Sequence, residues 1–102
     1  MVLKIEKSNL SKNDLIEMLR KDLPVLRARI GLSQEILADR IGISRQTYGA
    51  IENGKREMTW TTFLALVALF KSNEQTALML SQKGDLLIGI DQILNTQPEE
   101  DK

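Results

Sequence analysis

The chain has 102 residues, a formal net charge of zero and 42% hydrophobic residues, as expected for one soluble globular domain. It contains neither cysteine nor histidine, which excludes disulfides, thiolate metal sites and the histidine bases of many enzymes. The longest strongly apolar stretch, residues 63–70, is far too short to span a bilayer, and the charges within residues 1–10 exclude a signal peptide. We therefore expect a cytoplasmic protein that is not an enzyme, with no metal and no cofactor.

Charge is distributed unevenly along the chain. Residues 20–58 carry eight basic and five acidic side chains, a net charge of +3, whereas residues 72–102 carry two basic and six acidic ones, a net charge of −4. The basic segment suits contact with phosphate groups, and the acidic segment suits a surface turned away from them. Chance scatter also produces such asymmetry, so charge alone does not decide the function.

The first residues, 1–10, are predicted to form an N-terminal arm. Within it, Leu3 and Ile5 alternate with charged residues, a pattern that fits either a short strand or a frayed end. Ser11 and Asp14 then match a capping box, in which each residue binds the backbone N–H of the other. A helix is therefore expected to begin directly after Ser11.

A proline interrupts the first helical pattern. Apolar residues recur at helical spacing from Leu15 to Leu23, and the same apolar face continues as far as Ile30. Because Pro24 lacks a backbone donor, the pattern fits either one kinked helix or a second helix capped by Asp22. The residues alone leave both possibilities open.

Two short helices joined by a tight turn are predicted within residues 33–54. Ser33 and Ser44 are good N-caps, and Gly42 supplies the turn that ends the first of these helices. Such a pair crosses steeply, so that the second helix presents its N-terminal end outward. The side chains expected to face inward are Leu37, Ala38, Ile41, Ile43, Tyr48 and Ile51.

Further helices are predicted in the second half of the chain. Thr59 is expected to cap a fourth helix and Ser72 a fifth, and a last amphipathic helix follows Gly84. The extension at residues 72–95 has more apolar side chains than a single capping helix needs, which predicts that it forms a homodimer contact. Residues 96–102 are polar and predict a disordered tail.

The stretch Leu32–Lys55, LSQEILADRIGISRQTYGAIENGK, resembles the XRE/Cro-type helix-turn-helix family, which includes the lambdoid phage repressors. The resemblance covers residues 23–70 and implies an all-α, lambda-repressor-like domain of about five helices at residues 11–71, followed by one more amphipathic helix. It also implies a nucleoid-associated, sequence-specific regulator of transcription that binds double-stranded DNA and acts as a repressor.

The resemblance also implies which residues contact DNA. Gln34 would meet a phosphate from the start of the second helix, and Arg45, Gln46 and Thr47 would occupy base-reading positions after the cap Ser44. Arginine can bind guanine and glutamine can bind adenine, each through two hydrogen bonds, which agrees with this assignment. Phosphate contacts beside the following loop are expected from Asn53, Lys55 and Arg56.

Several prominent side chains have plainer interpretations. Gly49 and Ala50 stand where many family members carry longer polar residues, so direct base reading is expected to concentrate on Arg45 and Gln46. Tyr48 is three residues from Ile51 and is expected in the core, as is Trp60 at the start of the fourth helix. The carboxylates expected to form no catalytic pair are Glu35, Asp39, Glu52 and Glu57.

A second function of another class fits the same sequence. The acidic, apolar extension at residues 72–95 also suits the partner surface of an antitoxin-like module, which binds a second protein and regulates its own operon. The extension alone does not distinguish this possibility from a homodimer.

Overall fold

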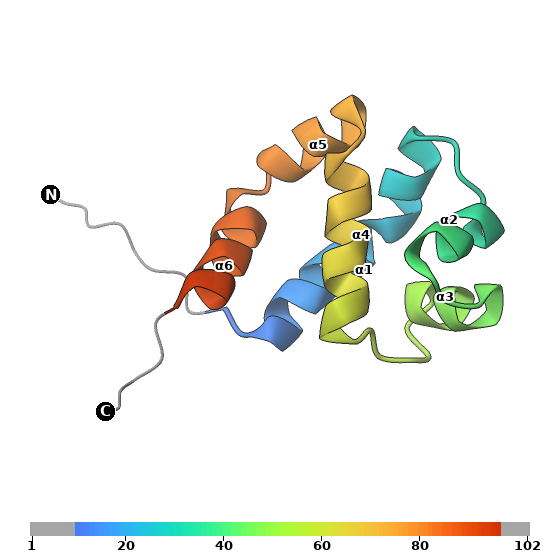
Figure 1. Ribbon diagram of the computed structural model, residues 1–102, viewed down its shortest axis with the longest axis horizontal. Helices are drawn as coiled ribbons and strands as arrows, with labels where there is room; N and C mark the ends of the chain where they lie inside the picture. Colours follow the sequence, from blue (N-terminus) through green and yellow to red (C-terminus); the bar gives the residue numbers. More distant parts are fainter. Residues whose placement is uncertain (1–9, 97–102) are drawn as a thin grey trace, which may run out of the picture.

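The computed structural model describes residues 10–96, and within this range the chain forms helices and no strand (Figure 1). This confirms the all-α prediction. Except for Leu10 and Thr96, the predicted arm and tail lie outside the described residues. None of the described helices is long and apolar enough to cross a membrane. The helices are α1 (Lys12–Arg29), α2 (Gln34–Ile41), α3 (Arg45–Glu52), α4 (Trp60–Lys71), α5 (Glu74–Ser81) and α6 (Gly84–Asn95).

Helix α1 is one helix that continues through Pro24. The predicted capping box is present at its start, where Ser11 Oγ accepts the Asp14 N–H at 3.1 Å and the Asp14 carboxylate accepts the Ser11 N–H at 2.9 Å. Pro24 removes one backbone donor, but it lies on the exposed side of the helix. Leu23 and Leu26 on either side are fully buried, and this burial stabilises the helix across the proline.

Helices α2 and α3 are joined by the predicted tight turn. Ser33 caps α2 by accepting the Ile36 N–H at 3.1 Å, and Ser44 caps α3 in the same way. Between them Gly42 has a φ of 85°, a left-handed conformation that L side chains rarely adopt. Its N–H and that of Ile43 both donate to the Ala38 carbonyl, which ends α2 and redirects the chain into α3.

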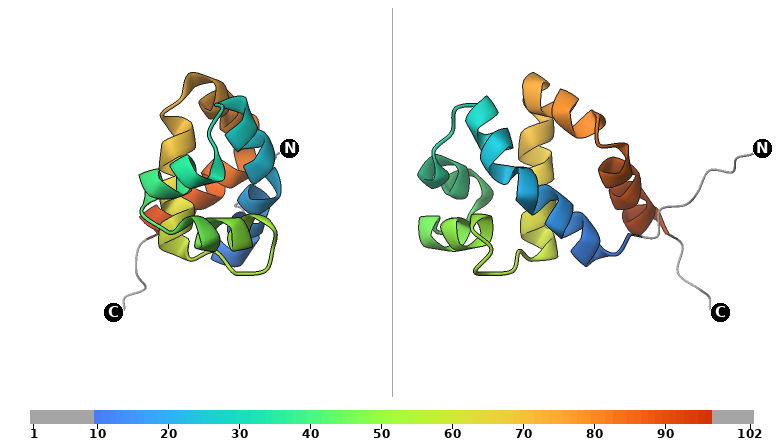
Figure 2. Two further views of the ribbon diagram at one scale, coloured as in Figure 1. Left: turned by 90° about the vertical axis from the view of Figure 1, so that its right-hand side faces the viewer. Right: turned by 180° about the vertical axis from the view of Figure 1, so that it is seen from behind.

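Helix α4 runs through the middle of the molecule, with α2 and α3 on one side and α5 and α6 on the other (Figure 1). Its apolar face is fully buried at Phe63, Leu66 and Phe70. The folded part measures 45 × 31 × 22 Å, and α3 and α6 lie at opposite ends of its longest axis (Figures 1 and 2). The α3 end is therefore free of the C-terminal helices.

The cap of α5 differs from the predicted one. Asn73, not Ser72, begins this helix, because its Oδ1 accepts the N–H groups of Gln75 and Thr76. The prediction for Ser72 was wrong because that residue still belongs to the end of α4, where its N–H bonds the Ala68 carbonyl at 3.1 Å. The two connecting residues, Ser72 and Asn73, leave α5 packed against α4.

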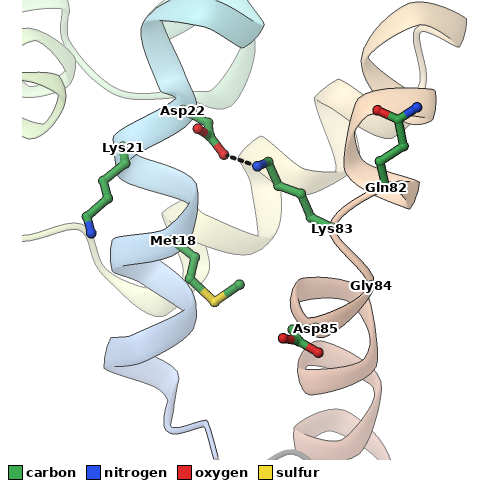
Figure 3. Close-up of a pocket in the computed structure, with 7 residues that line it drawn as sticks. All are labelled: Met18, Lys21, Asp22, Gln82, Lys83, Gly84 and Asp85. Carbon is green, nitrogen blue, oxygen red and sulfur yellow. Dashed lines mark ion pairs between the residues drawn. The ribbon is translucent and has the colours of Figure 1, made fainter.

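Helix α6 packs on the N-terminal half of α1. At Gly89 the two helices come so close that a Cβ there would lie 2.7 Å from Leu15 Cδ2. At the other end of this contact, Lys83 Nζ forms an ion pair with Asp22 Oδ2 at 3.0 Å (Figure 3). An open hollow of about 480 Å³ lies beside this ion pair. It is lined by Met18, Lys21, Asp22, Gln82, Lys83, Gly84 and Asp85.

Candidate nucleic-acid interface

The start of α3 is an exposed and firmly capped helix end. Ser44 Oγ accepts the Thr47 N–H at 3.0 Å and also donates to Thr47 Oγ1 at 2.9 Å. Arg45 and Gln46 follow the cap, and both side chains are exposed. Helix α3 lies at one end of the longest axis of the molecule (Figure 1), so this exposed helix start is far from α5 and α6.

The inner side of α3 is fixed in the core. Tyr48 is fully buried and Ile51 is 2% exposed, which confirms the predicted core position of Tyr48. Trp60 at the start of α4 stacks on the buried ring of Phe63, with centroids 4.8 Å apart, and the Lys12 ammonium lies 5.2 Å from its ring centroid. Trp60 therefore packs against the core, as its sequence position predicted.

A carboxylate at the end of α3 connects three helices. Glu52 accepts hydrogen bonds from Arg27 Nε and Nη2 at 3.0 Å each, from Tyr48 Oη at 2.7 Å and from Gln34 Nε2 at 2.8 Å. Arg27 belongs to α1, and its Nη1 also donates to the Leu32 carbonyl at 3.1 Å. The orientation of α3 against α1 and α2 is thus set by charge-assisted hydrogen bonds as well as by apolar packing.

These hydrogen bonds shift the pKa values of their members. Burial opposes ionisation of Glu52, but the hydrogen bonds from Arg27, Tyr48 and Gln34 outweigh it and lower the pKa of this carboxyl. The hydrogen bond to Glu52 raises the pKa of Arg27. Burial, together with the bond to Glu52, raises the pKa of the Tyr48 hydroxyl. At neutral pH the cluster is therefore an ion pair with a neutral tyrosine.

Gln34, the expected phosphate contact of α2, is part of this cluster. One N–H of its amide is used by Glu52, and its Oε1 lies against Gly49, where a Cβ would stand 3.4 Å away. Since a primary amide carries two N–H donors, one remains for a phosphate oxygen. Gln34 is half-buried and held in place at the start of α2.

The remaining predicted residues lie in the loop after α3. Gly54 has a φ of 82°, and the N–H groups of Lys55 and Arg56 both donate to the Ala50 carbonyl, which folds the loop back on α3. Asn53 Oδ1 also accepts the Lys55 N–H at 3.2 Å. The side chains of Asn53, Lys55 and Arg56 are exposed on this loop, which folds back on α3, and α2 and α3 lie at the same end of the molecule (Figure 1).

Sequence reasoning did not identify three residues that shape this site. The sequence predicts only that Glu52 forms no catalytic pair, although its position four residues after Tyr48 is a helical spacing that indicates a contact between the two side chains. Arg27 is 25 residues away from Glu52, and no local pattern joins them. Arg20 of α1 lies beside the loop, with Nη1 3.5 Å from the position of a Cβ on Gly54.

Apart from the cap Ser44, the exposed groups of the site are cationic or amide side chains, Arg45, Gln46, Lys55 and Arg56 among them. Among residues 10–96, no group of three or more acidic side chains is arranged to hold a metal ion.

A search of curated proteins and of solved structures finds no match. A family model described as helix-turn-helix matches residues 25–75, which is half of the chain and includes α2, α3 and α4. This chain belongs to the XRE-type helix-turn-helix family of DNA-binding regulators.

Proposed function

We propose that this protein is a sequence-specific transcriptional repressor that reads the major groove of double-stranded DNA with α3. The observation that carries this proposal is the exposed pair Arg45 and Gln46, which follows a capped helix start and stands on a helix fixed from behind by Tyr48 and Ile51. A helix of this kind offers its N-terminal side chains to base edges. Thr47, engaged with Ser44, supports the helix start and offers a methyl group to the groove.

Phosphate contacts on both sides of α3 would hold it in the groove. Gln34 offers its second N–H from α2, and Asn53, Lys55 and Arg56 offer polar and charged groups from the loop. Such contacts position a protein on the duplex without reading its sequence. Binding of this protein to a promoter site in the nucleoid would repress transcription by occupying the DNA, with no catalytic step.

Selection of bound sequences from random double-stranded DNA tests the proposal. We expect the full-length protein to enrich a short motif, and the Arg45→Ala variant to lose preference at one base pair of it. A reporter promoter carrying the motif should be expressed less when the protein is present. No enriched motif, or equal binding to all sequences, would contradict sequence-specific recognition. Increased reporter expression would contradict repression alone.

We further propose that the protein binds as a homodimer through the outer face of α6. Ile88 and Leu94 on this helix are 50% and 57% exposed, although its inner face already packs on α1. Exposed apolar side chains on a helix whose inner face is already packed suit a contact with a second copy of the chain. Its place at the opposite end from α3 leaves both recognition helices free, and two half-sites supply the discrimination that one short helix lacks.

Sedimentation of the full-length protein at micromolar concentration tests the dimer. We expect a dimer for the wild type, a monomer for Leu94→Glu, and a dimer for the control Val25→Glu, which changes an equally exposed apolar residue on α1. A monomeric wild type, with and without DNA, would contradict the homodimer. It would favour the antitoxin-like alternative, in which the same face binds another protein.

A further inference from the structure

A small basic hollow lies between α1 and the loop after α3. It has a volume of about 270 Å³. Its lining combines cations from two parts of the chain that are far apart in sequence, together with two carboxylates. The lining residues are Glu17, Arg20, Gly54, Lys55, Arg56 and Glu57.

Arg20 is placed so that its guanidinium reaches the loop. Its Nε and Nη2 donate to the Glu17 carboxylate at 2.9 to 3.1 Å, and this bond raises the pKa of Arg20 and lowers that of Glu17. Its Nη1 points to the loop instead, 3.5 Å from where Gly54 would carry a Cβ. No described residue accepts a hydrogen bond from Nη1, so this nitrogen is open to a first contact with a ligand, and a second parallel bond from Nη2 requires release from Glu17.

We propose that Arg20, Lys55 and Arg56 form a binding site for one phosphodiester of the DNA backbone, and that Glu17 competes with this phosphate for Arg20. The proposal rests on the DNA-binding function proposed above and extends the contact surface from the loop to α1. A guanidinium binds phosphate through parallel N–H donors, as it binds a carboxylate, so a phosphate can replace Glu17.

The exchange with Glu17 costs little free energy because this ion pair is exposed. The side chains of Glu17 and Arg20 are 55% and 26% accessible, and an exposed pair of this kind contributes little to stability. The lining carries three cations and, with Glu57, two carboxylates, which leaves an excess of one positive charge in the hollow. A phosphate that enters the hollow therefore meets three cations. One of them, Arg20, exchanges its hydrogen bonds with Glu17 for hydrogen bonds with the phosphate.

Two charge-neutralising variants test the site on the motif selected above. Arg20→Gln should bind DNA about 3- to 10-fold more weakly at moderate salt and reduce the slope of log affinity against log salt by about one. Its control, Lys71→Gln, removes an exposed cation from the last turn of α4 and should change neither quantity appreciably. Equal behaviour of the two variants would overturn the proposal.

Removal of the competing carboxylate should have the opposite effect. Glu17→Gln should bind roughly 1.5- to 5-fold more tightly, the range expected for releasing an exposed ion pair. Glu74→Gln, which removes an exposed carboxylate from α5, controls for the change in net charge. An equal gain in both variants would contradict the role of Glu17.

The phosphate itself is identified by replacing single phosphates of the motif with neutral methylphosphonates. We expect one position at which the replacement weakens the wild type but leaves Arg20→Gln unchanged. The same positional pattern in both proteins would overturn the proposal. If inorganic phosphate saturates the site in the wild type but not in Arg20→Gln, and no DNA position depends on Arg20, the ligand is a free phosphate and the DNA assignment is wrong. A wild type with no preferred motif would contradict the proposed function instead.

Discussion

Arg27 donates to both carboxylate oxygens of Glu52, from Nε and Nη2 at 3.0 Å each, and thereby fixes α3 against α1. The Glu52 side chain is only 9% accessible and that of Arg27 22%. Because Glu52 also accepts from Gln34, the ion pair that fixes α3 also holds Gln34, the proposed phosphate contact of α2. We therefore expect fold stability and DNA binding to depend on the same carboxylate.

Glu52→Gln is expected to lower the free energy of unfolding by about 2–4 kcal/mol, because the half-buried Arg27 then lacks its anion. Urea unfolding at pH 7, followed by the fluorescence of Trp60, measures this loss. Glu35→Gln, an exposed change in the first turn of α2, is the control and should lose less than about 0.5 kcal/mol. Equal stability of the two variants would show that the ion pair contributes nothing.

The contribution of Glu52 should depend on pH. Its pKa in the folded protein lies below the ordinary 4.5, so the folded state favours the ionised carboxylate more than the unfolded state does. The stabilisation is then fully present above pH 4.5 and is lost as the pH falls through the folded pKa. The stability difference between wild type and Glu52→Gln, measured by urea unfolding, should stay constant above that range and shrink below it. A difference that grows on acidification would contradict the lowered pKa.

Gly49→Ala is expected to stabilise the protein by up to about 1 kcal/mol, because glycine weakens the interior of α3. The added Cβ would stand 3.4 Å from Gln34 Oε1, which is an ordinary contact. Thermal unfolding measures the change. A lower melting temperature would mean that this methyl group displaces Gln34 from its bond with Glu52.

Gly89→Ala makes the same chemical change in α6 and should have the opposite result. Its Cβ would lie 2.7 Å from Cδ2 and 3.3 Å from Cδ1 of the fully buried Leu15. Overpacking of this kind costs about 1–3 kcal/mol, which thermal unfolding would detect. The double variant with Leu15→Val should recover part of the loss, and failure to recover any of it would locate the cost elsewhere.

Arg45→Ala and Gln46→Ala should each lose about 1–3 kcal/mol of binding free energy on the preferred DNA site and much less on random DNA. Lys55→Ala should instead weaken both kinds of DNA alike, because a phosphate contact carries no sequence information. Fluorescence anisotropy with labelled duplexes at several salt concentrations separates the two patterns. Equal losses on both DNAs for Arg45→Ala would show that this residue only positions the protein.

Local interactions explain why much of this protein could be predicted from its sequence. The caps Ser11, Ser33 and Ser44 bind N–H groups three residues further on, and Gly42 turns the chain within a few residues. Such contacts join residues only a few positions apart, so they depend mainly on the local sequence. The sequence by itself therefore determined the helices, the turn and the exposed start of α3. It left Pro24 undecided and placed the α5 cap one residue too early, since adjacent polar residues compete for the same role.

The tertiary structure decided which distant residues meet. Arg27 and Glu52 are 25 positions apart, and neither the contact of Leu15 with Gly89 nor that of Arg20 with Gly54 leaves a local trace. A charged or small residue has the same helical spacing whether it faces water or another helix. Only the packing of α1 against α3 and α6 shows which of these residues contact another helix. The sequence therefore determined which end of α3 faces outward, whereas the fold determined what holds α3 in place, because ion pairs and close helix contacts depend on the positions of whole helices.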